Sequence, residues 1–338
     1  MNKTISIKGS CEIYVGRVES VLPRVLPRRR VVVITDANID RLYPDLVHRF
    51  DYIVIGHGEA SKTLMTVQRV YKRLIELGAD RSTFLLGIGG GIVTDVTGFV
   101  AATYMRGLDF GFISTTLLGQ VDASVGGKNG VNVNDYKNMV GTFTQPCFVI
   151  SDVEMLRSLP KRELRAGMAE VIKAAVIADR ELFEYLEKQP VETFIDNPET
   201  MCNIVWSCVG IKADIVERDE REGGVRRLLN LGHTMAHAIE KCAHEINHGE
   251  AVAMGMAMIC DAAVRHGVLQ AEDRDRICAL LTRFGFTLLP PVPTARLLRE
   301  VRKDKKRQQN DIHAVLPTGI GSCSVVKMPM EEFESMFG

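Results

Sequence analysis

Short runs of β-branched and aromatic residues alternate with segments of helical length throughout the first 150 residues of the chain. This alternation predicts strands over residues 31–35, 52–55, 83–88, 110–114 and 147–150, and helices over residues 63–78 and 93–104. Strands that alternate with helices form βαβ units, in which helices cover a mostly parallel sheet. This part of the chain is therefore restricted to a doubly wound α/β architecture.

The pattern changes after Ser151, where helical periodicity takes over. Helices are predicted over residues 160–190, 199–217, 233–242, 250–266 and 272–283, with Gly267 as a C-terminal cap, and a hairpin over residues 312–316 and 323–326. At 338 residues the chain is long for a single hydrophobic core. We therefore predict an α/β protein with a Rossmann-like domain, residues 1–150, followed by a mainly α-helical domain, residues 151–338.

Charge and composition argue against several classes of function. Lys+Arg 42 balances Asp+Glu 42, which argues against a nucleic-acid or membrane-surface binder but leaves room for a local anion site. The N-terminus lacks the apolar core of a signal peptide, and no apolar run approaches the roughly 20 residues that span a bilayer. The eight cysteines form no CxxC pair and are expected to be reduced thiols. We expect a cytoplasmic protein.

Polar and Gly-rich segments follow three of the predicted strands. Residues 85–95 are predicted to form the end of a strand, a glycine turn and a helix start, where free helix N–H groups favour phosphate. Ile92 departs from the G-x-G-x-x-G fingerprint. Residues 36–38 and 58–62 follow the first two strands. Each segment alone is more readily explained as a surface turn. Together, at the edge where open α/β sheets bind ligands, they favour a nucleotide.

The segment from Thr115 to Asn132 follows another predicted strand and is interpreted as one short loop. It carries the hydroxyls of Thr115 and Thr116, the carboxylate of Asp122, two adjacent glycines and Lys128. Glycines let backbone N–H groups approach a ligand, and a neighbouring lysine completes an anion site. The alternative is an ordinary polar loop.

The helical half contains a candidate metal-binding set. His233 and His237 lie four residues apart on one face of a predicted helix, and His248 precedes another helix. Glu170 and Lys173 lie on an otherwise apolar helix, where a carboxylate is costly unless it is paired or bound to a metal. One Glu and two His form a known catalytic zinc set, although a single histidine is more often a structural hydrogen-bonding group.

Residues 244–248 also match H-E-x-x-H, the zinc-peptidase pattern. That chemistry needs both histidines on one continuous helix, whereas residues 247–249 are predicted to end a loop. We interpret the match as coincidental.

Several long blocks, in the right order, resemble the 3-dehydroquinate synthase family from about residue 30 to residue 325. The blocks are GGGIVTDVTGFVAATYMRG, TTLLGQVDASVGGKNGVN, YKNMVGTFTQP, LPKRELRAGMAEVIK, DEREGGVRRLLNLGHTMAHAIE, HGEAVAMGM and DKK. The resemblance implies an NAD-binding domain followed by a metal- and substrate-binding domain. It also implies a homodimer with one NAD⁺ and one Zn²⁺ (or Co²⁺) in each active site.

The reaction that this resemblance implies belongs to the shikimate pathway and converts 3-deoxy-D-arabino-heptulosonate 7-phosphate to 3-dehydroquinate. NAD⁺ oxidises the C5 hydroxyl, phosphate is eliminated, the same NADH reduces the ketone, and the ring opens and recloses by an aldol step. The metal would act as a Lewis acid on the substrate's vicinal hydroxyls. In this family the departing phosphate can itself take the C6 proton.

Matching positions imply the residues of the site. The implied metal ligands are Glu170, His233 and His248. The implied substrate-binding and catalytic residues are Arg106 (toward the neighbouring subunit), Asp122, Lys128, Asn138, Lys173, Lys212, Arg226, Asn230, His237 and Lys306, or its neighbour Lys305. The implied NAD contacts are Asp36, Asn38, Glu59, Lys62, Gly89, Gly90, Gly91, Asp95, Thr115, Thr116, Lys128, Lys137, Met155, Leu156, Arg157 and Ser158.

Some of these residues have plain structural alternatives. Lys212 and Arg226 could lie on solvated helix faces, Asn230 could cap the helix at His233, and residues 302–307 could be a solubilising charge run. For the whole chain the alternatives are another sugar phosphate cyclase, such as 2-deoxy-scyllo-inosose synthase, a metal-dependent polyol dehydrogenase, a non-catalytic NAD-binding regulator and a zinc peptidase. A peptidase would depend on the Glu of its motif, whereas a cyclase would not.

Overall fold

The computed structural model describes residues 3–7, 9–134, 136–305 and 311–338, and the chain divides into two compact units. The sheet unit comprises Met1–Leu164 and Met201–Glu217, and the helical unit comprises Arg165–Thr200 and Arg218–Gly338. Most of helix α9 (Pro198–Arg218) therefore belongs to the sheet unit, although it follows a segment of the helical unit. The division of the chain at residues 150/151 stays a prediction.

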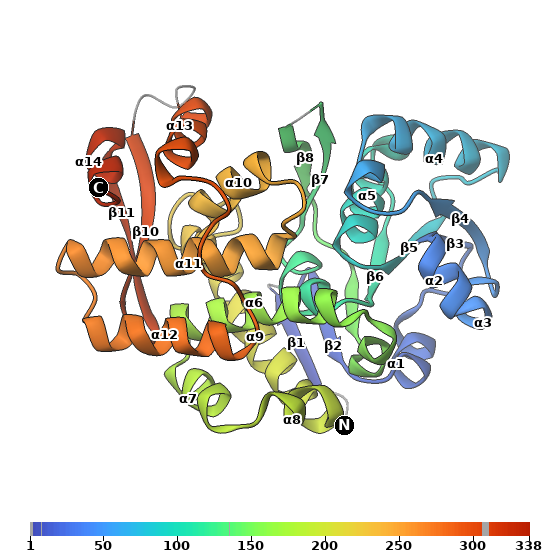
Figure 1. Cartoon of the computed structure of the whole chain (residues 1–338). Coiled ribbons are helices and arrows are strands. Elements are labelled where there is room, and N and C mark those ends of the chain that lie inside the picture. Colours follow the sequence, from blue (N-terminus) through green and yellow to red (C-terminus); the bar gives the residue numbers. More distant parts are fainter. Residues whose placement is uncertain (1–2, 8, 135, 306–310) are drawn as a thin grey trace. The chain divides into compact units, whose positions relative to one another are not determined.

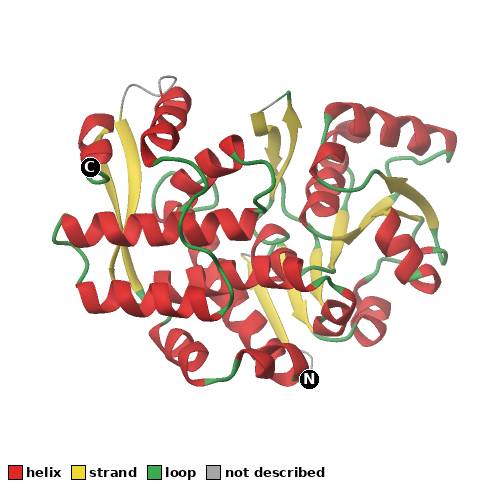
Figure 2. Cartoon of the chain, viewed as in Figure 1, coloured by secondary structure: helices red, strands yellow, loops and turns green. Residues whose placement is uncertain are grey.

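The sheet unit is built on a seven-stranded sheet, drawn in yellow in Figure 2. In spatial order its strands are β1 (Lys3–Ile7), β2 (Cys11–Val15), β9 (Phe148–Ser151), β6 (Phe110–Ser114), β5 (Phe84–Gly89), β3 (Val31–Asp36) and β4 (Asp51–Ile55). All neighbours are parallel except β1 and β2. The five predicted strands are present, and the mostly parallel α/β architecture is confirmed. Strands β1 and β2 were not predicted, because each is short and alternates only partly.

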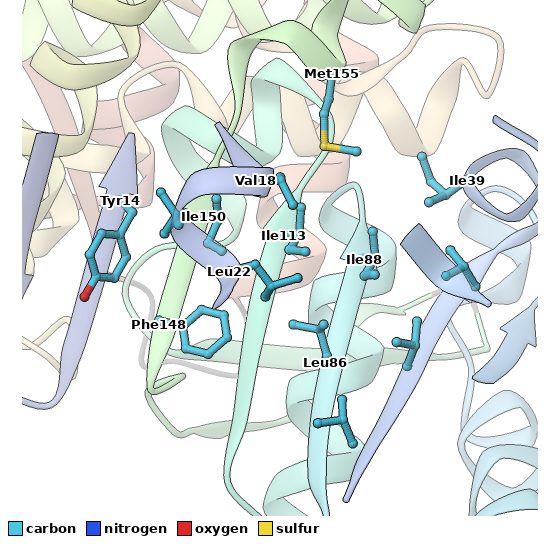
Figure 3. Packing of buried hydrophobic residues seen from close by; sticks show 14 of the residues in the cluster. Tyr14, Val18, Leu22, Ile39, Leu86, Ile88, Ile113, Phe148, Ile150 and Met155 are labelled. Atoms are coloured by element: carbon cyan, nitrogen blue, oxygen red, sulfur yellow. The ribbon is translucent and has the colours of Figure 1, made fainter. Parts of the chain in front are cut away.

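Helices cover this sheet as expected for βαβ connections (Figure 1). They are α1 (Val18–Val25), α2 (Ala37–Leu42), α3 (Pro44–Val47), α4 (Leu64–Glu76) and α5 (Gly91–Thr103). One core cluster joins α1 to the sheet through Val18 and Leu22, packed with Leu86, Ile113 and Ile150 (Figure 3). These β-branched and aliphatic side chains are fully or almost fully buried, so the alternation seen in the sequence reflects real core faces.

The strand order places a topological switch point at β3. The chain passes from β3 to β4 on one side and then returns to form β5 on the other side of β3. Ligands of open α/β sheets bind where the strand order reverses, at the carboxyl ends of the strands. The carboxyl ends here carry Asp36 and Gly89, so the predicted nucleotide loops lie at the expected edge.

The predicted loop from Thr115 to Asn132 is only partly a loop. Its last residues form strand β7 (Lys128–Val133), which pairs with β8 (Tyr136–Phe143). A Cβ at Gly98 of α5 would lie 1.9 Å from Oδ1 of Asn129, so glycine lets β7 approach that helix closely. The sequence concealed this strand because glycine and asparagine have low β-propensity.

The helical unit contains most of the remaining helices and one hairpin (Figures 1 and 2). Its elements are α6 (Lys161–Ala178), α7 (Arg180–Lys188), α8 (Val191–Asp196), α10 (His233–Cys242), α11 (His248–Arg265), α12 (Ala271–Arg283), α13 (Thr294–Lys305), β10 (Asp311–Gly319), β11 (Ser322–Pro329) and α14 (Met330–Ser335). The first residues of α6 belong to the sheet unit.

Most boundaries in this unit agree with the predictions, but one predicted helix is wrong. The pattern over residues 160–190 forms two helices, because the Asp179 side chain accepts a hydrogen bond from the Leu182 N–H (2.8 Å) and starts α7. Gly267 caps α11 as predicted, with φ of 71° and its N–H donating to the Val264 carbonyl (3.0 Å). Among the described residues, no helix combines the length and apolar character needed to cross a membrane.

Glycines allow α11 to pack unusually close to its neighbours. A Cβ at Gly249 would lie 2.3 Å from backbone atoms of Ala166 in α6. A Cβ at Gly255 would lie 2.2 Å from the carbonyl oxygen of Gly232, the residue that precedes α10. Side chains at the N-termini of α10 and α11 are therefore brought together with those of α6.

Candidate active site

Three side chains from three helices of the helical unit form a candidate metal centre. Glu170 comes from α6, while His233 and His248 are the first residues of α10 and α11. Their potential ligand atoms all lie within 4.8 Å of one another. Nε2 of His233 and Nε2 of His248 are 3.7 Å and 3.6 Å from Oε1 of Glu170. One carboxylate and two imidazoles fit a catalytic zinc set that leaves a coordination position open.

Local structure orients each of these ligands. Asn247 caps α11 in a reciprocal capping box with Glu250, so residues 244–248 do not lie on one helix. The zinc-peptidase interpretation of that segment is therefore unsupported by its geometry. Gly232, with φ of 77°, provides the left-handed turn before His233.

The outward ring nitrogens of both histidines have acceptors behind them. Nδ1 of His233 lies 3.1 Å from the carbonyl oxygen of Leu231, which can only accept, so this nitrogen carries the proton and Nε2 keeps its lone pair. Nδ1 of His248 lies 3.5 Å from Oε1 of Glu240, a buried carboxylate on α10. Both arrangements turn Nε2 toward Glu170.

Burial and charge separate the two histidines. Burial, together with nearby Lys173, lowers the pKa of His233 to about 3, so this ring is neutral. Burial also lowers the pKa of His248, but the hydrogen bonds and charges of Glu170 and Glu240 outweigh it and raise that pKa to about 10. A positive charge is thus favoured beside Glu170, where a bound cation would replace the proton.

Two predicted substrate residues lie beside the candidate metal ligands. Lys173, on the same helix as Glu170, forms a buried ion pair with its Oε2. The ring of His237 is 5.7 Å from the ring of His233 between centroids. The structure therefore brings these five residues of the helical unit into one group.

Arg226 and Asn230 lie in a short 3₁₀ helix, η5 (Val225–Asn230). Arg226 is only 2% exposed, so the solvated-face alternative is wrong for this residue. The Asp219 carboxylate accepts hydrogen bonds from the N–H groups of Gly224 (2.6 Å) and Arg226 (3.0 Å) and so shapes the preceding loop. Asn230 does not cap α10, because its amide donates to the Glu222 carboxylate.

Glu222 was not singled out in the sequence. It adopts a left-handed φ of 61°, which is unusual for glutamate, and accepts the hydrogen bond from Asn230. The sequence gives no sign of this role, because Glu222 is one of several charged residues in its segment. Only the folded loop turns its carboxylate toward Asn230.

In the sheet unit, predicted cofactor and substrate residues contact each other directly. Lys62 is buried (5% exposed), forms an ion pair with Asp95, and donates a hydrogen bond from Nζ to Oδ1 of Asn138 (2.5 Å). Burial raises the pKa of the Asp95 carboxyl, while Lys62 acts in the opposite direction. Asn132 joins this group by donating to Glu59 Oε1 (2.7 Å).

Asp122 and Lys212 form a second charged pair in the sheet unit. Asp122 lies in a π-turn, η3 (Gly119–Ala123), and its Oδ1 is 2.5 Å from Nζ of Lys212 on α9. Lys212 is 7% exposed, so the solvated-face alternative is also wrong here. Single π-turns inside proteins often mark functional positions.

The glycine turn leads into α5 without a capping side chain. Gly90 is the N-cap of α5, so its first N–H groups are offered to a ligand rather than to a side chain. A Cβ at Gly90 would also lie 2.7 Å from Cγ2 of Thr116, and the Thr115 N–H donates to the Gly89 carbonyl (3.0 Å). These glycines thus serve packing between loops as well as ligand approach.

The remaining predicted residues of the cofactor and substrate sites differ in what they can offer. Asp36 caps α2 through its side chain, and Asn38 hydrogen-bonds to Nδ1 of His57 (2.9 Å). Met155 and Leu156 are buried, Met155 in the core cluster, so their side chains face away from solvent. Arg157, Lys128, Lys137 and Arg106 are exposed, and Ser158 bonds to Tyr43. Lys306 lies outside the described residues; Lys305 ends α13.

Known proteins resemble this chain along most of its length. Residues 52–166 match the family model of the 3-dehydroquinate synthase N-terminal domain, and residues 167–307 match that of the C-terminal domain. A 3-dehydroquinate synthase of Pelobacter propionicus is 40% identical over 320 residues, which cover 91% of this chain and 89% of the relative.

Two solved structures share the whole fold. The 2-epi-5-epi-valiolone synthase ValA of Streptomyces hygroscopicus, solved with NAD⁺ and Zn²⁺ bound, is 29% identical, with a TM-score of 0.88 and coverage of 99% of this chain and 96% of its own. A 2-deoxy-scyllo-inosose synthase complexed with carbaglucose-6-phosphate, NAD⁺ and Co²⁺ is 24% identical, with a TM-score of 0.87 and coverage of 100% and 99%, which shows similarity of fold.

Proposed function

Because the chain belongs to the 3-dehydroquinate synthase family, we propose that the residues described above carry out that family's reaction. The enzyme is an NAD- and metal-dependent lyase that eliminates phosphate from 3-deoxy-D-arabino-heptulosonate 7-phosphate and forms 3-dehydroquinate. The observation that carries the assignment of residues is the group formed by Glu170, His233 and His248, whose ligand atoms lie within 4.8 Å of one another.

Each cofactor has a matching set of residues. A divalent metal, which supplies Lewis-acid chemistry when bound, would be held by Glu170 and the two histidines. NAD⁺, which supplies reversible hydride transfer, would place its phosphates at the uncapped N-terminus of α5 beside Gly90. The loops at the carboxyl ends of β3 and β4 would complete its site.

The substrate carries a phosphate and a carboxylate, which a chain of zero net charge must bind with local cations. Lys173 and Arg226 supply buried cations in the helical unit, and Lys212 supplies one in the sheet unit. Asp122, oriented by Lys212, can accept hydrogen bonds from substrate hydroxyls. Asn138, held by Lys62, can orient the substrate through its amide.

The test is turnover of purified protein supplied with Zn²⁺, catalytic NAD⁺ and the heptulosonate 7-phosphate. Phosphate release and NADH absorbance are followed together, and the product is identified by mass spectrometry. Stoichiometric phosphate and 3-dehydroquinate without accumulating NADH would support the proposal. No phosphate from folded, metal-loaded protein would contradict it and favour the hexose or heptulose phosphates of related cyclases. Accumulating NADH would instead indicate a polyol dehydrogenase.

We also propose a homodimer in the cytoplasm. Arg106 and Met105 adopt left-handed φ values of 70° and 49° on an exposed turn, which would suit a contact with a second subunit. Cys11, in β2, and Cys147, just before β9, are each followed by residues that pair across these two strands. Both are free thiols, which is typical of a reducing compartment. Light scattering of the purified protein would measure the oligomeric state, and fractionation of cells would test the location.

A further inference from the structure

We propose that Asn132 is a positioning residue that couples the cofactor loop, residues 58–62, to Asn138. The inference rests on the proposed function, because Glu59 and Lys62 are assigned there to NAD and Asn138 to the substrate. Asn132 itself touches neither ligand in this proposal. It acts through the residues to which it is hydrogen-bonded.

Both polar atoms of the Asn132 side chain are used. Its Nδ2 donates to Oε1 of Glu59 (2.7 Å), and its Oδ1 accepts from the backbone N–H of Asn138 (2.8 Å). Its own backbone N–H donates to the carbonyl of Lys62 (2.8 Å). A single half-buried residue therefore joins two segments that are far apart in the sequence.

The backbone at this point is shaped to allow the bridge. The pairing of β7 with β8 shifts register between Val131 and Val133, so that Asn132 lies opposite three residues of β8, 137–139. The extra residues of β8 include Asn138, and such irregularities are common next to functional sites. Asn132 also forms an isolated parallel bridge with Thr63, which continues the contact to the start of α4.

Lys62 also holds Asn138. Its Nζ donates to Oδ1 of Asn138 (2.5 Å) and forms an ion pair with Asp95. Asn138 has φ of 53°, a left-handed conformation that needs support from its surroundings. Its backbone is thus fixed by Asn132 and its side chain by Lys62. A ligand that orders the cofactor loop would also order Asn138, and by linkage the reverse holds.

The test reverses the direction of one hydrogen bond. In Asn132→Asp, one carboxylate oxygen still accepts from the Asn138 N–H, but the other faces Glu59 without a proton to donate. In Glu59→Gln, the introduced amide keeps an acceptor for Asn132. In the double variant the amide introduced at position 59 donates to the carboxylate introduced at position 132, which restores the bridge. We measure the Kd for NAD⁺ by calorimetry, with and without a phosphonate analogue of the substrate, and the substrate KM and kcat.

We expect Asn132→Asp to raise both the Kd for NAD⁺ and the substrate KM by about tenfold or more, because two carboxylates then face each other without the hydrogen bond that joined the segments. The double variant should return to within about threefold of Glu59→Gln alone, which reflects coupling between neighbours. The effect of the phosphonate on NAD⁺ affinity should be lost in Asn132→Asp and recovered in the double variant. A purely structural role would lower the melting temperature without this recovery.

Asn134→Gly is the matched control. Asn134 lies in the same hairpin, is exposed, and has φ of 51°, so glycine fits its conformation and the constants should stay within about twofold of wild type. If the effects of Asn132→Asp and Glu59→Gln on the Kd for NAD⁺ were additive, the inference would be overturned, even where the wild type converts the substrate. Recovery of NAD⁺ affinity in the double variant of a chain that releases no phosphate would overturn the proposed function instead and leave the coupling intact.

Discussion

Buried charge is arranged differently in the two units of this protein. In the sheet unit, Lys62 and Lys212 each hold a carboxylate, Asp95 and Asp122, so the charges balance in pairs. In the helical unit, Lys173 and two histidines converge on the carboxylate of Glu170, and a second carboxylate, Glu240, lies behind His248. Balanced pairs fix the position of a side chain, whereas an acidic centre surrounded by nitrogen ligands can exchange a proton for a metal ion. The difference suggests that the first unit is built to position groups and the second to bind a cation.

The largest expected effect comes from removing the acidic centre. We expect Glu170→Gln to weaken metal binding by roughly 1000-fold or more. Even the loss of a residue that only hydrogen-bonds to a metal ligand lowers metal affinity by about 10–100-fold. Phosphate release should fall to background with it. Metal content after dialysis and turnover are measured on the same samples.

Glu245→Gln is the matched control for that variant. It removes the glutamate of the H-E-x-x-H pattern, which is exposed and lies outside the candidate metal centre. Metal content and turnover should match the wild type. Loss of metal in this variant, or full metal occupancy in Glu170→Gln, would break the contrast between the two units.

A smaller effect is expected from breaking a balanced pair. Lys62→Met leaves Asp95 partly buried without its cation, which should lower the free energy of unfolding by about 3 kcal/mol. The double variant Lys62→Met, Asp95→Leu should recover most of that loss, because it removes both charges. Urea unfolding measures both. If Lys62→Met were as stable as the wild type, the ion pair of Lys62 with Asp95 would not hold residues 58–62 in place.

Close packing between α10 and α11 should affect metal binding, although the residue that is changed is not a metal ligand. A Cβ at Gly255 would lie 2.2 Å from the Gly232 carbonyl, so Gly255→Ala must push the helices apart at a cost of about 2 kcal/mol. Because His233 and His248 begin these helices, metal affinity should fall as well. Gly210→Ala is the control: its Cβ would meet only Ile5, at 3.9 Å, and helix propensity should raise stability by about 0.5–1 kcal/mol. Thermal unfolding and metal titration compare the two.

The smallest effect concerns the carboxylate behind His248. Glu240→Gln keeps the shape of the side chain but removes the charge 3.5 Å from Nδ1 of that ring. We expect metal affinity to fall by about tenfold, measured by competition with a chelator, and the Co²⁺ absorption spectrum to shift. An unchanged affinity and spectrum would show that the second carboxylate does not orient the ring.

Much of the sheet unit could be predicted because its signals are local. The five predicted strands stand out as apolar runs, and a glycine turn between a strand and a helix carries its own ligand preference. Strand β7 escaped prediction because its stability comes from pairing with β8 and from the close approach to Gly98, neither of which a local pattern contains. The break at Asp179 was missed because helical periodicity continues on both sides of it.

The candidate site was predicted unevenly for the same reason. His233 and His237 share a helix face by spacing alone, and the family's sequence blocks indicated Glu170 as a third member of the site. The burial of Lys212 and Arg226, and the hydrogen bond of Asn230 to Glu222, appear only in the fold.

By itself, the sequence determined the chemistry available to this protein: a parallel-sheet framework, a phosphate-binding turn, one carboxylate and two imidazoles for a metal, and a family in which these act together. Only the tertiary structure decided which of these groups meet. Glu170 reaches His233 and His248 because glycines let α11 pack against its neighbours, and Asn132 contacts both Glu59 and Asn138 where the pairing of β7 with β8 becomes irregular. The metal centre and the contact of Asn132 with Glu59 join residues distant in the chain, and such contacts depend on packing that no local pattern encodes.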